Sequence, residues 1–180
     1  MNIPNFLSLL RIILVPVFVI FLIQYSYASA LIVFTIAGLT DALDGALARL
    51  LNKQTKLGAF LDPLADKILL TTSFISLSIF GLIPGWLTVI VISRDFIILL
   101  GIMILSMMSV TYEIKPLFVS KITTGLQIGT VFLTLFLESF TYNIVSRDLI
   151  FTLSWLTASF TIISGLFYIF KGINFINRTA

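Results

Sequence analysis

Four of the eight acidic residues in this chain lie between positions 41 and 66, flanked by stretches that are strongly apolar. They form two pairs, Asp41 with Asp44 and Asp62 with Asp66. An ionised carboxylate is costly inside a membrane, so carboxylates that converge there share cations or line a wet site. The pattern therefore predicts a site that binds metal ions.

The spacing predicts how the carboxylates converge. Residues three or four apart share one face of a helix, so each pair presents both of its carboxylates on one side. Gly45 lies one turn after Asp41, Gly58 lies one turn before Asp62, and Ala48 is close by. These small residues let a second backbone or a ligand approach closely.

The residue types indicate the chemistry. Carboxylate oxygens are the ligands that Mg²⁺ and Mn²⁺ prefer, and Arg49 adds a planar cation that suits phosphate oxygens. The chain has no Cys and no His, which removes thiolate and imidazole ligands and bases. Carboxylates, a divalent ion and a guanidinium together favour chemistry on a diphosphate. Two other uses stay open, a structural ion-pair network and the ion site of a cation-coupled or proton-coupled transporter.

The same residues stand in the order Asp-x2-Asp-Gly-x2-Ala-Arg-x8-Gly-x3-Asp-x3-Asp, without a departure. This order resembles the signature of the CDP-alcohol phosphatidyltransferase family, whose members displace CMP from a CDP-linked lipid with the hydroxyl group of an alcohol. The resemblance implies that a pair of Mg²⁺ or Mn²⁺ ions is held by Asp41, Asp44, Asp62 and Asp66. It also implies that Asp66 is the general base. The residues that it places at the CDP pocket are Gly45, Ala48, Arg49 and Gly58.

Composition places the chain in a membrane. Hydrophobic residues make up 59% of it, charged residues 11%, and the mean hydropathy is +1.14. These values lie far from those of soluble domains. At about 20 residues per crossing, we expect one all-α membrane domain over residues 1–180, a bundle of about six transmembrane helices. A net charge of +3 on such a chain reflects membrane topology, and we expect no nucleic-acid partner.

The expected spans follow from the apolar runs. They cover residues 12–25, 30–50, 57–80, 86–108, 119–137 and 149–170, after a lead over 1–10 and before a tail over 171–180. We expect a turn over 81–85, where Gly and Pro gather. Pro16 either kinks the first span or is a harmless membrane proline.

Basic residues near the ends of these spans predict the orientation. Those on one side are Arg11, Arg49, Lys53, Lys56, Lys115, Lys121, Lys171 and Arg178, against Arg147 on the other. The positive-inside rule then places both termini and the mouth of the active-site cavity in the cytosol. We expect the bacterial cytoplasmic (inner) membrane as the location, with membrane lipids as partners.

The acceptor side of the site is less strongly specified. Arg94 and Asp95 fall inside the fourth span, where they either compensate each other or present Arg94 to an acceptor or diphosphate oxygen. Lys115 and Lys121 are the other candidate acceptor contacts, although a lysine at a helix end is also a common anchor at the membrane surface.

Two further patterns follow in the fifth span. Lys121, Thr124 and Gln127 recur at helical spacing, and we expect them on one face. The pair Gly125 and Gly129 favours helix packing within the bundle, with a homodimer contact as the alternative.

The segments outside the motif bear on which alcohol is used. Asn2 to Asn5 with Arg11, and Thr161 to Gly172, look like the phosphatidylglycerophosphate synthases of the family. Ser93-Arg94-Asp95 and the run from Lys115 to Lys121 resemble its CMP-forming cardiolipin synthases. Thr123 stands where the phosphatidylglycerophosphate synthases have a second lysine. The resemblance therefore implies CDP-diacylglycerol as donor and glycerol 3-phosphate as acceptor, with phosphatidylglycerol as the alternative acceptor.

Overall fold

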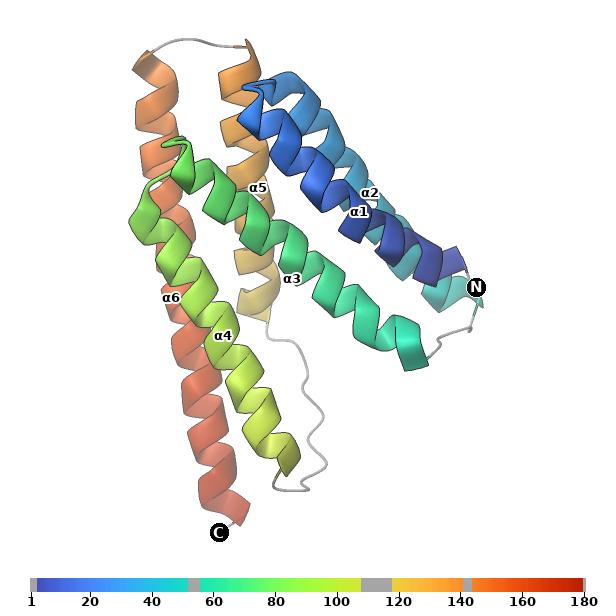
Figure 1. Ribbon diagram of the computed structural model, residues 1–180. Helices are drawn as coiled ribbons and strands as arrows, with labels where there is room; N and C mark the ends of the chain where they lie inside the picture. Colours follow the sequence, from blue (N-terminus) through green and yellow to red (C-terminus); the bar gives the residue numbers. More distant parts are fainter. Residues whose placement is uncertain (1–2, 52–55, 108–117, 141–143, 180) are drawn as a thin grey trace.

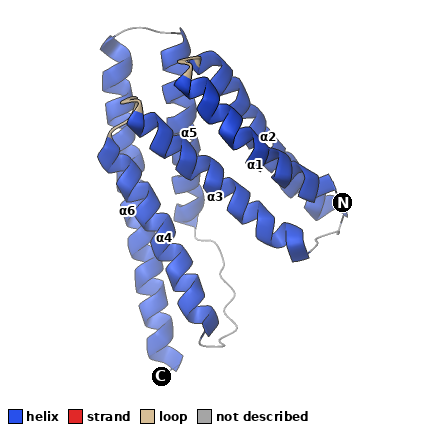
Figure 2. Cartoon of the chain, viewed as in Figure 1, coloured by secondary structure: helices blue, strands red, loops and turns tan. Residues whose placement is uncertain are grey.

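Apolar runs with few internal breaks form helices, which satisfy every backbone hydrogen bond internally. The computed structural model accordingly consists of six helices over the residues that it describes (Figure 1). These residues are 3–51, 56–107, 118–140 and 144–179, with side chains described at 9–40, 67–101, 103, 119–140 and 147–172. Within them all regular structure is helical, as Figure 2 shows, which confirms the expected all-α class.

The helix bounds match most of the expected spans to within a few residues. The helices are α1 (Ile3–Ile23), α2 (Tyr27–Leu51), α3 (Lys56–Ile79), α4 (Gly85–Met107), α5 (Phe118–Phe140) and α6 (Ile144–Thr179). Pro16 lies inside α1, and the helix continues through it.

The two ends of the chain differ from the expectation. The lead is helical from Ile3, because Pro4 stands in the first turn, where its missing N–H costs nothing. The expected tail is the last part of α6, since the sequence after Lys171 contains no proline to stop the helix. With 36 residues α6 is about 54 Å long, which exceeds the hydrocarbon core of a bilayer, about 30 Å.

The turn between α3 and α4 confirms the break expected over 81–85. Gly81 adopts a left-handed conformation with φ of 69°. The N–H of Gly81 donates to the carbonyl of Ser78 (3.0 Å), and that of Leu82 to the carbonyl of Leu77 (2.9 Å). This pair of hydrogen bonds closes the C-terminal end of α3. Tyr25, with φ of 55°, closes α1 in the same way.

The helices pack in an order that places α3 and α5 centrally. Helix α1 packs against α2 and α3, while α6 packs against α4 and α5. Helix α5 also contacts α2 and α3, and α3 contacts α4. Figure 1 shows α1 and α2 on one side of α3 and α5, and α4 and α6 on the other.

The distribution of polar and apolar side chains differs from that in a soluble protein, although a core of buried apolar residues is also present. Large apolar residues are exposed along the helices, among them Ile79, Val89, Phe140 and Phe170. Hydroxyl and amide side chains are buried between helices; they include Ser73, Thr123, Gln127, Thr130, Thr157, Thr161 and Ser164. The first kind of surface suits lipid. Hydrogen bonds to the carbonyl four residues earlier in the same helix, or to a neighbouring helix, satisfy the second kind.

Two helical segments in the described part of the chain are long and apolar enough to cross a membrane. They are Val119–Phe140 and Arg147–Gly172. Three shorter apolar segments, Leu9–Ile23, Tyr27–Thr40 and Lys67–Ile79, belong to α1, α2 and α3.

Candidate functional site

The motif lies on two consecutive helices. Asp41 and Asp44 fall in the second half of α2, and Asp62 and Asp66 in the first half of α3. The helical spacing that puts each pair on one face is therefore present in the backbone. The side chains of residues 41–66 lie outside the described residues, and with them the expected CDP contacts Gly45, Ala48, Arg49 and Gly58. Lys115 also lies outside them.

The two acidic pairs lie at similar distances, counted in residues, from the connection between α2 and α3. Asp41 is ten residues before the last residue of α2, and Asp66 is ten residues after the first residue of α3. Asp44 and Asp62 are both closer to the connection between the helices. At about 1.5 Å per residue, each member of one pair has a counterpart at nearly the same distance from that connection. Binding of ions jointly by α2 and α3 stays a prediction.

Helix α1 adds a cation that the sequence interpretation used for membrane orientation and for the resemblance at the start of the chain. Arg11 is fully buried. Helix α1 packs against both helices that carry the motif. A buried guanidinium has to be balanced by anions or hydrogen-bond acceptors. Arg11 is thus an interior charge of the bundle, and its position in an otherwise apolar run was the signal for this.

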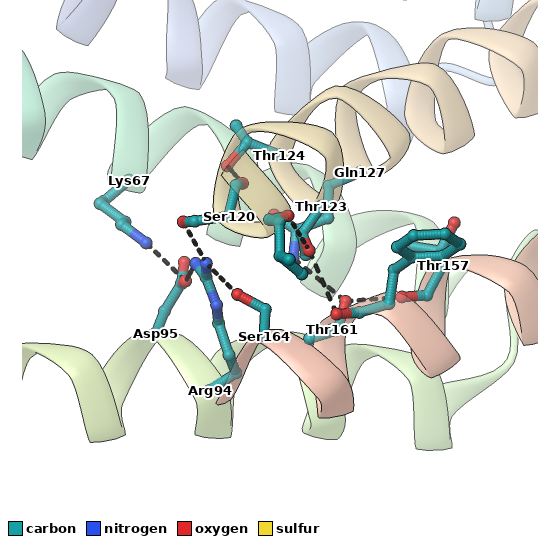
Figure 3. Close-up of polar contacts among 12 residues, drawn as sticks. Lys67, Arg94, Asp95, Ser120, Thr123, Thr124, Gln127, Thr157, Thr161 and Ser164 are labelled. Atoms are coloured by element: carbon teal, nitrogen blue, oxygen red, sulfur yellow. Dashed lines mark hydrogen bonds and ion pairs between the residues drawn. The ribbon is translucent and has the colours of Figure 1, made fainter. Parts of the chain in front are cut away.

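A second charged cluster is fully described and lies where α3, α4, α5 and α6 meet (Figure 3). We call it the Arg94 network; its members are Lys67, Arg94, Asp95, Ser120 and Ser164. The Oδ1 atom of Asp95 lies 2.5 Å from Lys67 Nζ and 2.8 Å from Arg94 Nη1. The Nη2 atom of Arg94 donates to Ser120 Oγ (2.6 Å) and to Ser164 Oγ (2.9 Å). One carboxylate is therefore shared by two cations, with α3 tied to α4, and α4 to α5 and α6.

Arg94 is held firmly by its surroundings. Its side chain is 5% exposed, and its guanidinium lies over the ring of Tyr168, 5.8 Å from the centroid. A Cβ atom at Gly165 would lie 3.5 Å from Arg94 Cγ, an ordinary contact distance, so only a larger side chain there would displace Arg94. Charge compensation between Arg94 and Asp95 is thus realised, while contact of Arg94 with an acceptor stays a prediction.

Lys67 is the member that the sequence interpretation missed. It directly follows Asp66, and its side chain is 36% exposed. Its partner Asp95 is far away in sequence, on the next helix. The available signal was that Lys67 is a third charge in the span expected over 57–80, because a charge inside a membrane requires a partner.

A line of hydrogen bonds continues from this network between α5 and α6 (Figure 3). Thr123 Oγ1 lies 3.1 Å from the carbonyl oxygen of Phe160, and Thr130 and Thr157 share a hydrogen bond of 2.8 Å. The amide of Gln127 lies 3.5 Å from Thr161 Oγ1. These contacts fix the register of α5 on α6, and hence the positions of the serines around Arg94.

The prediction that Lys121 and Gln127 lie on the same face of α5 was wrong. Lys121 is exposed, whereas Gln127 is buried against α6. Six residues along a helix bring them about 120° apart. The buried face instead contains Ser120, Thr123, Gln127 and Thr130, which lie within about 80° of one another. Thr123, at the position of the second lysine in the resembled pattern, is a packing residue here.

Close helix packing at Gly125 and Gly129 is not seen among the residues whose side chains are described. An added Cβ atom at either position would meet nothing within 4 Å in the described structure. Close helix approach therefore does not explain these glycines, and the homodimer alternative stays a prediction.

Comparison with known proteins assigns the chain to a family. The family model described as CDP-alcohol phosphatidyltransferase matches residues 1–163. The chain belongs to the CDP-alcohol phosphatidyltransferase family. This confirms the resemblance that rested on the spacing of the aspartates.

Relatives within the CDP-alcohol phosphatidyltransferases carry two kinds of name. The Bacillus subtilis (strain 168) CDP-diacylglycerol--glycerol-3-phosphate 3-phosphatidyltransferase is 34% identical over 186 residues, covering 94% of each chain. The enzyme of that name from Aquifex aeolicus (strain VF5) is 36% identical over 126 residues, 69% of this chain and 70% of its own. The human cardiolipin synthase (CMP-forming) is 36% identical over 176 residues, which is 89% of this chain. The chain spans only 58% of the human protein.

Proposed function

We propose that this chain transfers the phosphatidyl group of CDP-diacylglycerol to glycerol 3-phosphate, forming phosphatidylglycerophosphate and CMP in phospholipid biosynthesis. The observation that carries the proposal is the family match over residues 1–163, which contains the whole aspartate motif on two consecutive helices. The Bacillus relative named for this reaction matches nearly end to end.

The membrane arrangement belongs to the same proposal. Residues 1–180 would form one domain whose six helices cross a bacterial cytoplasmic membrane, with both termini and the active-site cavity at the cytosolic face. The two apolar segments of spanning length, the lipid-suited surface and the one-sided basic residues support it.

The aspartates would hold the metal ions. The donor set fits Mg²⁺ or Mn²⁺, because carboxylates are the only strong ligands in a chain without Cys or His. The proposed ligands are Asp41, Asp44, Asp62 and Asp66. Such ions, when bound, neutralise the diphosphate and stabilise the departing CMP.

The reaction itself is a displacement at phosphorus. The acceptor hydroxyl oxygen bonds to the lipid-side phosphorus, the bond from that phosphorus to the bridging oxygen breaks, and CMP leaves with the electron pair. Asp66 takes the hydroxyl proton. Arg49 pairs with a phosphate oxygen, and the small residues Gly45, Ala48 and Gly58 give CDP room to approach the backbone. Arg94, Lys115 and Lys121 are the cations proposed for the acceptor side.

Cardiolipin synthesis is the second candidate. It is favoured by the human relative and by Ser93-Arg94-Asp95, and its acceptor would be phosphatidylglycerol. Mass spectrometry of the lipid product from the purified protein decides between the two. Phosphatidylglycerophosphate supports the first candidate, and cardiolipin replaces it with the second.

Two remaining alternatives have separate tests. A cation-coupled transporter would take up or exchange ions and leave CDP-diacylglycerol intact. A homodimer through the open face at Gly125 and Gly129 would dissociate in the Gly125→Leu variant, measured by light scattering in detergent; an unchanged mass would remove that face as the contact.

A further inference from the structure

The two cations that share Asp95 differ in how available they are. Arg94 is 5% exposed, and its two terminal nitrogens already bind Asp95, Ser120 and Ser164. Lys67 is 36% exposed, and Asp95 is its ion-pair partner in the described structure. An ammonium has three N–H donors, so Lys67 keeps donors that a ligand can reach. Arg94 also has a donor without a partner among the described residues, Nε, but that atom is buried.

Among the residues whose side chains are described, the network carries one more positive than negative charge. Lys67 and Arg94 together face the single carboxylate of Asp95. A cation in excess within a membrane protein is stabilised by an anion. Such an anion can bind at Lys67, which is the more exposed of the two cations.

The position of Lys67 in the chain indicates which anion this is. Consecutive residues of α3 have Cα atoms about 3.8 Å apart and lie about 100° apart around the helix. Lys67 reaches towards α4, where Asp95 holds it, and the proposed base precedes it in the chain. In glycerol 3-phosphate, three carbons separate the attacking hydroxyl group from the phosphate. Neighbouring residues of one helix can therefore serve the two ends of the acceptor.

We propose that the Lys67 ammonium binds the phosphate of the acceptor alcohol, and that Asp95, held by Arg94, is the residue that positions Lys67. The proposal rests on the proposed transferase function and names a further acceptor contact for it. The ligand chemistry is an anionic phosphate oxygen, which glycerol 3-phosphate and phosphatidylglycerol both offer. Arg94 then acts on the acceptor through Asp95.

The first test replaces the ammonium and keeps the stem. We expect Lys67→Met to raise the KM for the acceptor roughly 10- to 100-fold, the effect of one lost charge-assisted hydrogen bond. The KM for CDP-diacylglycerol should stay within about twofold, and Lys67→Arg should recover part of the loss. Arg147→Met is the control, because it removes the same charge from an exposed position near the start of α6. Equal rises in both KM values, or an unchanged acceptor KM, would overturn the assignment. Measuring both acceptors shows which phosphate is bound.

The second test asks whether Asp95 acts through Lys67. Asp95→Asn should raise the acceptor KM by less than Lys67→Met does, and the double variant should match Lys67→Met alone. Independent effects that multiply in the double variant would show that Asp95 does not position Lys67.

A binding measurement tests the role of Lys67 independently of the transfer reaction. Inorganic phosphate should raise the melting temperature of the wild-type protein and of Arg147→Met, but not that of Lys67→Met. Wild-type protein that releases no CMP contradicts the transferase function, whereas an equal phosphate shift in all three proteins contradicts the role of Lys67.

Discussion

Replacing Arg94 with Met tests whether the Arg94 network holds four helices together. The substitution keeps most of the stem beside Gly165 and Tyr168 but removes the hydrogen bonds to Asp95, Ser120 and Ser164. Hydrogen bonds to a charged group contribute about 1.5–3 kcal/mol each. Part of that loss is offset, because the buried guanidinium no longer has to be desolvated and Asp95 keeps Lys67. We therefore expect a net loss of about 2–3 kcal/mol in the free energy of unfolding.

The assay is reversible unfolding in mixed micelles, with two reference variants. Thr157→Val removes the neutral hydrogen bond to Thr130, and such bonds between membrane helices average about 0.6 kcal/mol. Ser159→Ala changes an exposed hydroxyl that bonds within its own helix, so its effect should be near zero. If Arg94→Met were no more destabilising than Thr157→Val, the network would not be what joins α4 to α5 and α6.

Three further predictions follow from the site and its surroundings. Asp66→Asn should abolish CMP release while leaving the fold and the binding of CDP-diacylglycerol in place, measured by circular dichroism and lipid binding; wild-type turnover would remove Asp66 as the base. Lys121→Ala should raise the KM for the acceptor more than that for the donor, and no change in either would leave Lys121 as a surface anchor. Gly165→Ala should leave the melting temperature unchanged, because its Cβ would lie at an ordinary contact distance of 3.5 Å from Arg94 Cγ. Gly165→Leu should lower the melting temperature, because the larger side chain displaces that of Arg94. An unchanged melting temperature of Gly165→Leu would show that Arg94 is not confined there.

The helices and the motif could be predicted because both depend on residue type and local spacing. Apolar runs set the helix bounds to within a few residues, and Gly81 marked a turn that its positive φ explains. The helix bounds at the two ends of the chain were predicted wrongly for one reason. Neither Pro4 nor the sequence after Lys171 prevents the backbone from continuing as a helix.

The contacts between distant helices could not be predicted in the same way. The pairing of Lys67 with Asp95 depends on how α3 and α4 cross, which no local pattern specifies. The face of α5 was misassigned because Lys121 is charged and Ser120 is small, yet Ser120 is the residue that binds Arg94. In α5 the small hydroxyl residues mark the buried face better than the charged Lys121 does.

The central claim is tested most directly by CMP release from the purified protein with CDP-diacylglycerol and Mg²⁺ or Mn²⁺. We predict release that requires the metal and an acceptor, is faster with glycerol 3-phosphate than with phosphatidylglycerol, and is lost in Asp66→Asn. Folded wild-type protein that releases no CMP with either acceptor would contradict the transferase function.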